Sequence, residues 1–220
     1  MIDIADLDFA YPRGGFRLDV PRLTIERGAR VAVVGSSGTG KTTLLNLVAG
    51  LQVAARGHVT VDGQNLSALS DTQRRAFRAR RIGFIFQNFA LMDYLNAREN
   101  VLYPYRIAPG LVLDDAVRAR AEALATACGI EDRLDRHPGA LSQGEQQRVA
   151  ICRALVTRPG LILADEATGN LDPHTKTLIL DLLFERAAEA GATILAVTHD
   201  HALLPRFDRV IDFSELRRAA

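Results

Sequence analysis

The residues from Gly35 to Thr42 have the types and spacing needed to bind a polyphosphate. Glycines let the backbone wrap around an anion, and a helix that begins there directs its N–H groups and its dipole toward that anion. In such a loop Lys41 reaches the β- and γ-phosphates and Thr42 binds Mg²⁺. A tight glycine-rich turn would explain the glycines but not the Lys-Thr pair. The predicted phosphate-binding residues are therefore Gly35, Ser36, Ser37, Gly38, Thr39, Gly40, Lys41, Thr42 and the following Thr43.

Two acidic residues end the apolar run Leu161–Ala164. Asp165 and Glu166 thus lie where a buried parallel strand would finish, which is where ligands bind in open α/β sheets. Asp165 suits a direct or indirect hold on Mg²⁺, and Glu166 suits a general base that orients water toward the γ-phosphate. A polar strand end turning into a loop is the simpler alternative, but the upstream phosphate loop favours the catalytic interpretation.

Gln87 and His199 also follow strand-like runs. Either residue alone would more often be a polar group at the end of a strand. If both strands run parallel to the strand before Gly35, however, the two side chains lie at the same sheet edge as Glu166. That shared position favours a functional role for both.

A second helix start lies far along the chain, in the stretch Leu141-Ser142-Gln143-Gly144-Glu145-Gln146-Gln147. Ser142 and Glu145 have the spacing of a capping box, in which each side chain satisfies a backbone N–H of the first turn. A capped helix start is also a site where phosphate can bind. The sequence therefore contains two possible anion sites, and the second needs an explanation.

These residues need strands and helices that alternate. Strand-like runs occur at Arg30–Val34, Gly57–Asp62, Ile82–Phe86, Leu161–Ala164, Thr193–Val197 and Arg209–Phe213, and helical runs at Leu44–Ala49, Asp114–Cys128 and about 173–190. Alternation of this kind predicts a parallel α/β sheet. Residues 88–156 are predominantly helical and are predicted to be an insertion within it. The opening segment reads as short strands, with Ile2 and Ile4 and then Leu7 and Phe9 as the apolar positions.

Composition narrows the class of protein. The 220 residues carry a net charge of +1, which gives no general attraction to nucleic acid or acidic lipid. The apolar runs are too short to cross a bilayer, and the N-terminus lacks the order of a secretion signal. Cys128 and Cys152 lack metal-ligand spacing, which favours a reducing compartment. The arginine cluster at 74, 75, 78, 80 and 81 is predicted to be a solvated helix face, with a lipid-phosphate or partner contact as the alternative.

Taken together, the ordered motifs resemble those of ATP-binding cassette (ABC) ATPases, over essentially the whole chain. The motifs are GSSGTGKT, Gln87, LSQGEQQ, LILADE, Gly169-Asn170-Leu171-Asp172 and His199. The resemblance implies an α/β P-loop NTPase (RecA-like) core, an N-terminal antiparallel β-subdomain and an inserted α-helical subdomain. We expect a single domain over 1–220, with 1–87 and 157–220 forming the core and β-subdomain and 88–156 the helical subdomain.

The resemblance also implies roles for particular residues, with ATP and Mg²⁺ as ligands. Tyr11 looks like the residue that stacks on adenine, although it could be a simple turn aromatic. Gln87 resembles the sensor of Mg²⁺ and water, His199 the switch histidine at the γ-phosphate, and Asp172 the loop acid that crosses to a partner. Ser142, Gly144 and Glu145 resemble the signature that reaches the ATP of a second subunit. With Thr42, Gln87 and Asp165 as expected metal-binding residues, Lys41, Gln87, Glu166 and His199 form the expected catalytic set.

Two positions depart from the family pattern. Gln143 replaces the first signature glycine, which leaves Ser142 and Gly144 intact, and Ala167 replaces a proline often found after the catalytic glutamate. TGNLD together with LSQGEQQRVA resembles the branch of lipoprotein-releasing, macrolide-exporting and cell-division ATPases.

The resemblance leaves three functions open. The leading interpretation is a homodimeric ATPase on the cytoplasmic face of the cell membrane that drives separate permease subunits, which would dock between Gln87 and Leu141, including Tyr94, Tyr103 and Tyr105. A regulatory ATPase without cargo is the alternative. A soluble ABC protein acting on ribosomes or DNA is disfavoured by the single cassette and near-neutral charge, so no nucleic-acid partner and no direct membrane insertion are expected. A P-loop kinase or GTPase would leave LSQGEQQ unexplained.

Overall fold

The computed structural model describes residues 1–12, 15–169 and 171–216. Within these residues, nine strands are distributed over two sheets. The antiparallel sheet has the order β2-β1-β4-β5 and contains β1 (Ile2–Ala10), β2 (Arg17–Ile25), β4 (Arg56–Val61) and β5 (Gln64–Asn65). The parallel sheet has the order β6-β7-β8-β3-β9 and contains β3 (Arg30–Val34), β6 (Ile82–Ile85), β7 (Leu161–Asp165), β8 (Thr193–Val197) and β9 (Arg209–Asp212).

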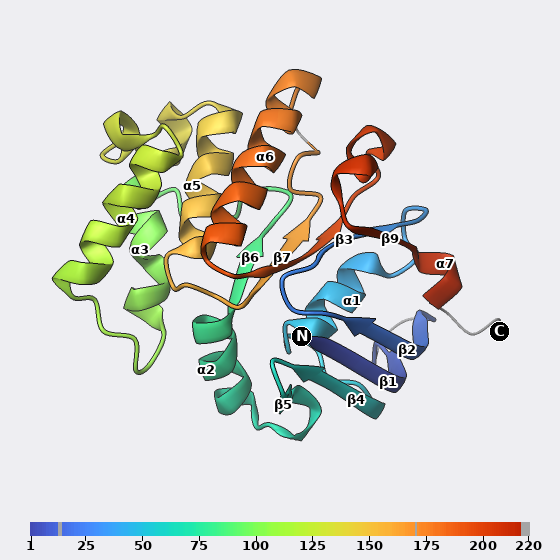
Figure 1. Ribbon diagram of the computed structural model, residues 1–220. Coiled ribbons are helices and arrows are strands. Elements are labelled where there is room, and N and C mark those ends of the chain that lie inside the picture. Colours follow the sequence, from blue (N-terminus) through green and yellow to red (C-terminus); the bar gives the residue numbers. More distant parts are fainter. Residues whose placement is uncertain (13–14, 170, 217–220) are drawn as a thin grey trace.

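Seven α-helices accompany the sheets within these residues (Figure 1). They are α1 (Lys41–Val48), α2 (Asp71–Arg81), α3 (Ala97–Ile107), α4 (Asp115–Ala127), α5 (Gln143–Leu155), α6 (Pro173–Glu189) and α7 (Phe213–Leu216). Short 3₁₀ turns at Leu66–Ala68, Glu131–Arg133, Pro138–Ala140 and His201–Arg206 complete the regular structure. The alternation predicted from the sequence is therefore confirmed, as is the α/β class.

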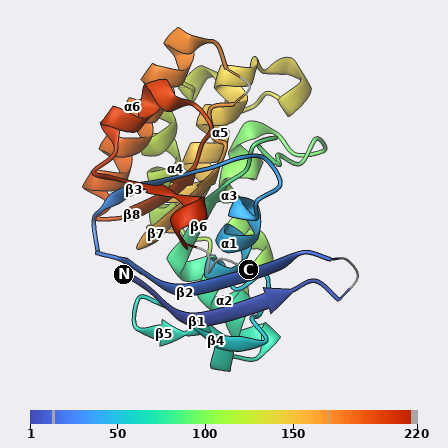
Figure 2. The ribbon, with the colours of Figure 1, turned by 90° about the vertical axis from the view of Figure 1, so that its right-hand side faces the viewer.

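The parallel sheet is covered on both faces. Residues that alternate along each strand enter two different cores, as a period of two requires. Ala32, Ile162 and Ile194 pack with α3, α4, α5 and α6, whereas Val31 and Leu163 pack with α1 and the antiparallel sheet. Figure 2 shows α1 between the antiparallel sheet and the parallel sheet. Helix α1, and with it the phosphate loop, is thus held between two sheets.

The N-terminal prediction needs one correction. The two apolar pairs Ile2/Ile4 and Leu7/Phe9 belong to one nine-residue strand, not to separate short strands. The register of β1 against β4 shifts between Ala5 and Asp8, and Asp6 has a φ of 47°. This β-bulge adds one residue, which moves the apolar positions from even to odd numbers while keeping them on the buried face.

The arginine cluster on α2 is only partly a solvated face. Arg78 donates to the carbonyls of Ala49 and Gly50, and burial lowers the pKa of its guanidinium. Arg74 is largely covered and donates to the carbonyl of Leu69. Two of the five arginines therefore connect α2 to the end of α1 and to the loop before α2. The long arginine side chain packs its aliphatic part along the protein while the guanidinium reaches these backbone oxygens.

Candidate functional site

The carboxyl ends of the parallel strands carry the predicted site residues. The phosphate loop follows β3, Gln87 lies two residues beyond β6, Asp165 ends β7, and His199 lies two residues beyond β8. All these strands run parallel, so their carboxyl ends meet at one edge of the sheet. The predicted shared position of Gln87 and His199 is therefore confirmed.

The phosphate loop leaves the first turn of α1 open. Gly40 occupies the N-cap position with a φ of 109°, and within the described residues no side chain caps this helix. Gly35 and Gly38 also have positive φ values, which a glycine adopts without the strain of a Cβ. The free N–H groups and helix dipole favour an anion here.

Lys41 closes over the loop. Its Nζ donates to the carbonyl oxygens of Gly35 at 2.8 Å and Ser36 at 2.7 Å, and the residue is buried. Thr39 Oγ1 also donates to the Ser36 carbonyl, at 2.9 Å. The loop is therefore preorganised by its own side chains, with the ammonium group held beside the first turn of α1.

The pocket in front of this loop has a volume of about 440 Å³. Its lining joins loop, strand ends and aromatic residues: Tyr11, Phe16, Ser37, Gly38, Gly40, Lys41, Thr42, Thr43, Gln87, Asp165, Glu166 and Val197. Its size and its polar lining suit a nucleoside triphosphate. Tyr11 lies in this pocket, with its hydroxyl 3.2 Å from Thr43 Oγ1. Its stacking on adenine stays a prediction.

Phe16 lines the pocket although no pattern in the sequence predicts it. A Cβ built on Gly40 would lie 2.4 Å from the end of the Phe16 ring, so a larger residue at this position would displace the ring. Tyr11 and Phe16 have ring centroids 6.0 Å apart and together form an aromatic wall. No periodicity or motif marks Phe16 in the sequence, because its contact with Gly40 joins residues that are far apart in the chain.

A hydroxyl and a carboxylate that could hold Mg²⁺ lie together. Thr42 Oγ1 donates to Asp165 Oδ1 at 3.3 Å. Burial raises the pKa of Asp165, and the neighbouring Glu166 carboxylate raises it further, whereas the hydrogen bond from Thr42 and the charge of Lys41 lower it. A hard cation prefers oxygen ligands and would offset the cost of burying this carboxylate. The donor set therefore fits Mg²⁺.

Glu166 is held from two sides. Gln87 Nε2 donates to its Oε2 at 2.9 Å, and His199 Nδ1 lies 3.3 Å from its Oε1. The backbone of Glu166 has a φ of 47°, a strained value for a residue with a side chain. Its N–H donates to the Val197 carbonyl at 3.0 Å, which ties the strained residue to the end of β8. The carboxylate is thereby fixed beside Asp165, facing the pocket.

The second helix start lies outside this pocket. Ser142 Oγ accepts from the Glu145 N–H at 3.3 Å, and Glu145 Oε2 accepts from the Ser142 N–H at 2.8 Å, so the predicted capping box is present. Arg133 binds the other oxygen of Glu145 at 2.6 Å. Ser142, Gly144 and Glu145 are all absent from the described lining of the phosphate-loop pocket.

Asp172 also lies outside the lining of the pocket. It caps α6 by accepting from the N–H groups of His174 and Thr175, both at 3.1 Å, and the hydrogen bonds from Thr175 lower its pKa. The neighbouring Asn170, part of the same motif, lies outside the described residues. Asp172 therefore caps a helix of its own chain. Its contact with a partner subunit stays a prediction.

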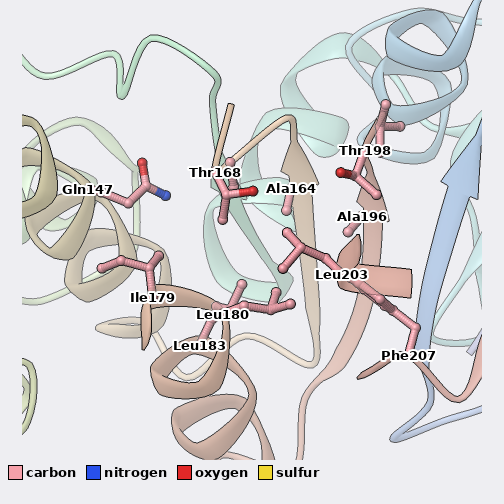
Figure 3. Close-up of a pocket in the computed structure, with 12 residues that line it drawn as sticks. Gln147, Ala164, Thr168, Ile179, Leu180, Leu183, Ala196, Thr198, Leu203 and Phe207 are labelled. Atoms are coloured by element: carbon pink, nitrogen blue, oxygen red, sulfur yellow. The ribbon is translucent and has the colours of Figure 1, made fainter. Parts of the chain in front are cut away.

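A smaller cavity of about 20 Å³ lies behind the loops that carry Glu166 and His199. Figure 3 shows Gln147, Thr168 and Thr198 among its otherwise apolar lining. The Gln147 amide is buried, and among the described residues neither its nitrogen nor its oxygen has a hydrogen-bond partner. The volume suits about one water molecule and is too small for a nucleotide.

Comparison with known proteins agrees with this geometry. The ABC transporter family profile matches residues 18–169. The chain belongs to the ABC transporter family. It is therefore an ATP-binding protein and an ATPase of that family, and the resemblance inferred from its motifs is confirmed.

Two kinds of ABC relatives stand out. The lipoprotein-releasing system ATP-binding protein LolD of Pseudomonas fluorescens is 45% identical over 194 residues, which is 88% of this chain and 85% of LolD. The macrolide export ATP-binding/permease protein MacB of Syntrophobacter fumaroxidans is 43% identical over 216 residues, which is 96% of this chain but only 30% of MacB. The chain is thus similar to most of LolD and to about a third of MacB.

A solved ABC structure confirms the fold. The ATP-binding cassette MJ0796, in a dimeric post-hydrolysis state bound to ADP and Pi, matches with a TM-score of 0.86 and 34% identity, over 99% of this chain and 94% of that one. The predicted fold class is therefore confirmed. Among the described residues, no helix has both the length and the apolar character needed to span a bilayer.

Proposed function

We propose that this ATPase acts as a homodimer, in which the phosphate-loop pocket of each copy faces the Ser142 helix start of the other. The separation of the two anion sites within one chain supports this arrangement. Ser142 and Gly144 carry the family signature yet lie outside the chain's own pocket, so a second copy would be needed to supply them. The dimeric state of the MJ0796 cassette also supports it.

In this proposal Lys41 and the N–H groups of the phosphate loop hold the β- and γ-phosphates. Thr42 and Asp165 hold Mg²⁺, with Gln87 beside them. Mg²⁺, when bound, neutralises part of the charge that develops on the transferred phosphoryl group. Tyr11 stacks on the adenine. In each copy, Glu145 stabilises the helix start at Ser142 that faces the ATP of the other copy, and Asp172 contacts the other copy.

Glu166 is proposed to orient the water that attacks the γ-phosphate and to accept its proton. The observation that carries this assignment is the clamp on its carboxylate, 2.9 Å from Gln87 Nε2 and 3.3 Å from His199 Nδ1. A base fixed in this way needs little reorganisation when the water attacks. His199, which lies beside Glu166, is proposed to contact the γ-phosphate as well.

Substitution of Glu166→Gln tests the assignment. The amide cannot accept the proton, so hydrolysis should fall by at least about 100-fold while ATP still binds. Size-exclusion chromatography with ATP should then show a stabilised dimer. Near-normal turnover in this variant would overturn the role of Glu166. If ATP produced no more dimer in this variant than in the wild type, that result would count against the closed-pair arrangement.

We further propose that the pair works on the cytoplasmic face of the membrane with separate permease subunits, as a force-transmitting or transport ATPase. A groove of about 660 Å³ between α2, β6, α3 and the end of α5 supports a docking site. Its lining includes Tyr103, Phe84 and Ile107, of which Ile107 is 61% exposed. An exposed apolar surface of this kind favours an amphipathic helix as the partner.

The three tyrosines expected near this docking site have different environments. Tyr103 lines the groove, and Tyr94 is 71% exposed. The Tyr105 hydroxyl instead accepts from Arg120 at 2.9 Å and lies 3.4 Å from the Val156 carbonyl, so this tyrosine serves the interior of the helical region.

The docking proposal is tested by affinity purification from detergent-solubilised membranes of the host cell. Ile107→Glu should reduce recovery of an integral-membrane partner by about tenfold, since it places a charge in an apolar groove. The basal ATPase should stay unchanged. Val112→Glu is the matched control, because Val112 is 73% exposed outside the groove. Equal recovery with both variants would refute docking at this surface.

A further inference from the structure

The turn that follows Gln87 contains two consecutive residues in the left-handed region. Phe89 has a φ of 60° and Ala90 a φ of 48°. Residues with a Cβ are strained there, and two in succession need compensation from their surroundings. The Phe89 N–H donates to the Phe86 carbonyl at 3.0 Å and the Ala90 N–H to the Asn88 carbonyl at 2.6 Å, so the turn closes tightly on itself.

Arg153 supplies contacts that hold both strained residues. Its Nη1 donates to the Ala90 carbonyl at 2.5 Å and its Nη2 to the Phe89 carbonyl at 2.6 Å. A planar guanidinium matches two neighbouring acceptors in a fixed geometry that a lysine cannot reproduce. Burial lowers the pKa of Arg153 to about 10, which still leaves it charged at neutral pH.

The position of Arg153 links three parts of the molecule. It lies on α5, the helix that begins at Ser142, and it lines the groove between α2 and α3. The turn that it holds begins at Gln87, whose amide donates to Glu166. A movement of α5, or pressure from a partner in the groove, would therefore reach Glu166 through this turn.

We propose that Arg153 is a positioning residue for hydrolysis, because its grip on the carbonyls of Phe89 and Ala90 aims Gln87 at Glu166. The proposal rests on the role of Glu166 proposed above. It differs from a purely structural role for Arg153 in its expected kinetics. Loss of the grip should disturb the chemical step and spare the binding of ATP, which depends on the phosphate loop.

The test is Arg153→Met in the full chain, with steady-state kinetics and ATP titration. We expect kcat to fall about tenfold with KM and the Kd for ATP within about twofold, since misalignment of a catalytic group raises the barrier without removing binding contacts. Arg153→Lys should retain an intermediate kcat. Hydrogen exchange at residues 87–91 should accelerate in the methionine variant.

Restoration by glycine makes the test specific. In the double variant Arg153→Met with Ala90→Gly, kcat should recover to at least about half of the wild-type value, because glycine adopts positive φ without strain and relieves the need for the guanidinium. Arg120→Met is the matched control. Arg120 also donates to a backbone carbonyl, that of Val156 at 2.8 Å, but it lies away from the Gln87 turn, and its kcat should match the wild type.

Three outcomes would overturn the proposal: a wild-type kcat in Arg153→Met, an equal loss of kcat and ATP affinity, or no recovery in the glycine double variant. A thermal melt of each variant identifies unfolding, and the double variant separates alignment from stability. Glu166→Gln, measured in parallel, separates the two proposals. If Glu166→Gln turns over normally, the role of Glu166 fails, whereas a wild-type Arg153→Met beside an inactive Glu166→Gln refutes only the role of Arg153.

Discussion

Helices α1 and α5 both begin where a phosphate could bind, but their first turns are satisfied in different ways. Gly40 precedes α1 with a left-handed backbone, and no described side chain caps this helix. Ser142 precedes α5 with an extended backbone, and its hydroxyl and the Glu145 carboxylate close a capping box. The first turn of α1 is thus open to a ligand, whereas in α5 the N–H groups of Ser142 and Glu145 are satisfied by side chains of the same helix start.

The difference indicates unequal shares in phosphate binding. An open helix start with a buried lysine can bind the nucleotide by itself. A self-capped start keeps its shape without a ligand, which suits a surface that must meet a nucleotide brought by another copy. Gly144 adds to this contrast. Among the described residues outside its own helix, the atom nearest to a Cβ at Gly144 would be Thr175 Cγ2 at 3.5 Å, whereas a Cβ at Gly40 would lie 2.4 Å from the Phe16 ring.

The largest effect is expected from a substitution at the start of α5. Ser142→Arg places a long cation where the partner's phosphate should lie, so turnover should fall by at least about 100-fold, as when a transition-state donor is removed. Binding of ATP to the monomer should stay within about twofold, because the α1 side is untouched. Turnover assays, ATP titration and size-exclusion chromatography check this. If monomer binding also collapsed, the separation of the two sites would be wrong.

The next largest effect is expected from a substitution at the start of α1. Lys41→Ala removes a buried ammonium group beside the phosphate loop, and the Kd for ATP should rise about 10- to 100-fold, the usual cost of a lost charge-assisted hydrogen bond. Titration of the purified variant with a fluorescent ATP analogue measures this. Affinity equal to wild type would remove Lys41 from the nucleotide site.

A matched pair of glycine substitutions sharpens the comparison. Gly40→Ala introduces a Cβ at a φ of 109° and against Phe16, so it should lower stability by about 1–3 kcal/mol and weaken ATP binding. Gly144→Ala lies inside a helix and should raise stability by up to about 1 kcal/mol. Chemical denaturation and ATP titration test both. Equal destabilisation by the two variants would show that the two helix starts are equally constrained.

The smallest effect concerns pH. The hydrogen bond from the Ser142 N–H, followed by that from Arg133, lowers the pKa of Glu145 below its usual 4.5. A lowered pKa gives stability that is present above the unfolded value and lost as pH falls through the folded value. Because the Glu145 carboxylate is still reached by solvent, which screens its charge, the change should be only tenths of a kcal/mol. Denaturation between pH 6 and about 3 should show a shallower decline in Glu145→Gln than in the wild type.

The sequence predicted some parts of the site better than others. The phosphate loop and the capping box were readable because their residues are adjacent in the chain and interact through local backbone geometry. Phe16 and Arg153 were not, because each acts on backbone that is distant in sequence: Phe16 on Gly40, and Arg153 on Phe89 and Ala90. The bulge at Asp6 was missed for a similar reason, since a shift from Ile4 to Leu7 also fits two short strands.

By itself, the sequence determined the fold class, the order of the strands and helices, and the residues that could bind phosphate. Hydrophobic periodicity and turn residues act locally, so they can be read without the partners they will meet. Only the tertiary structure decided that Gln87 and His199 clamp Glu166, that Arg74 and Arg78 are engaged with backbone oxygens, and that the Ser142 helix start lies outside the pocket. Each of these depends on which strands pair and how the helices pack against them, and contacts between distant segments are fixed only when the whole chain has folded.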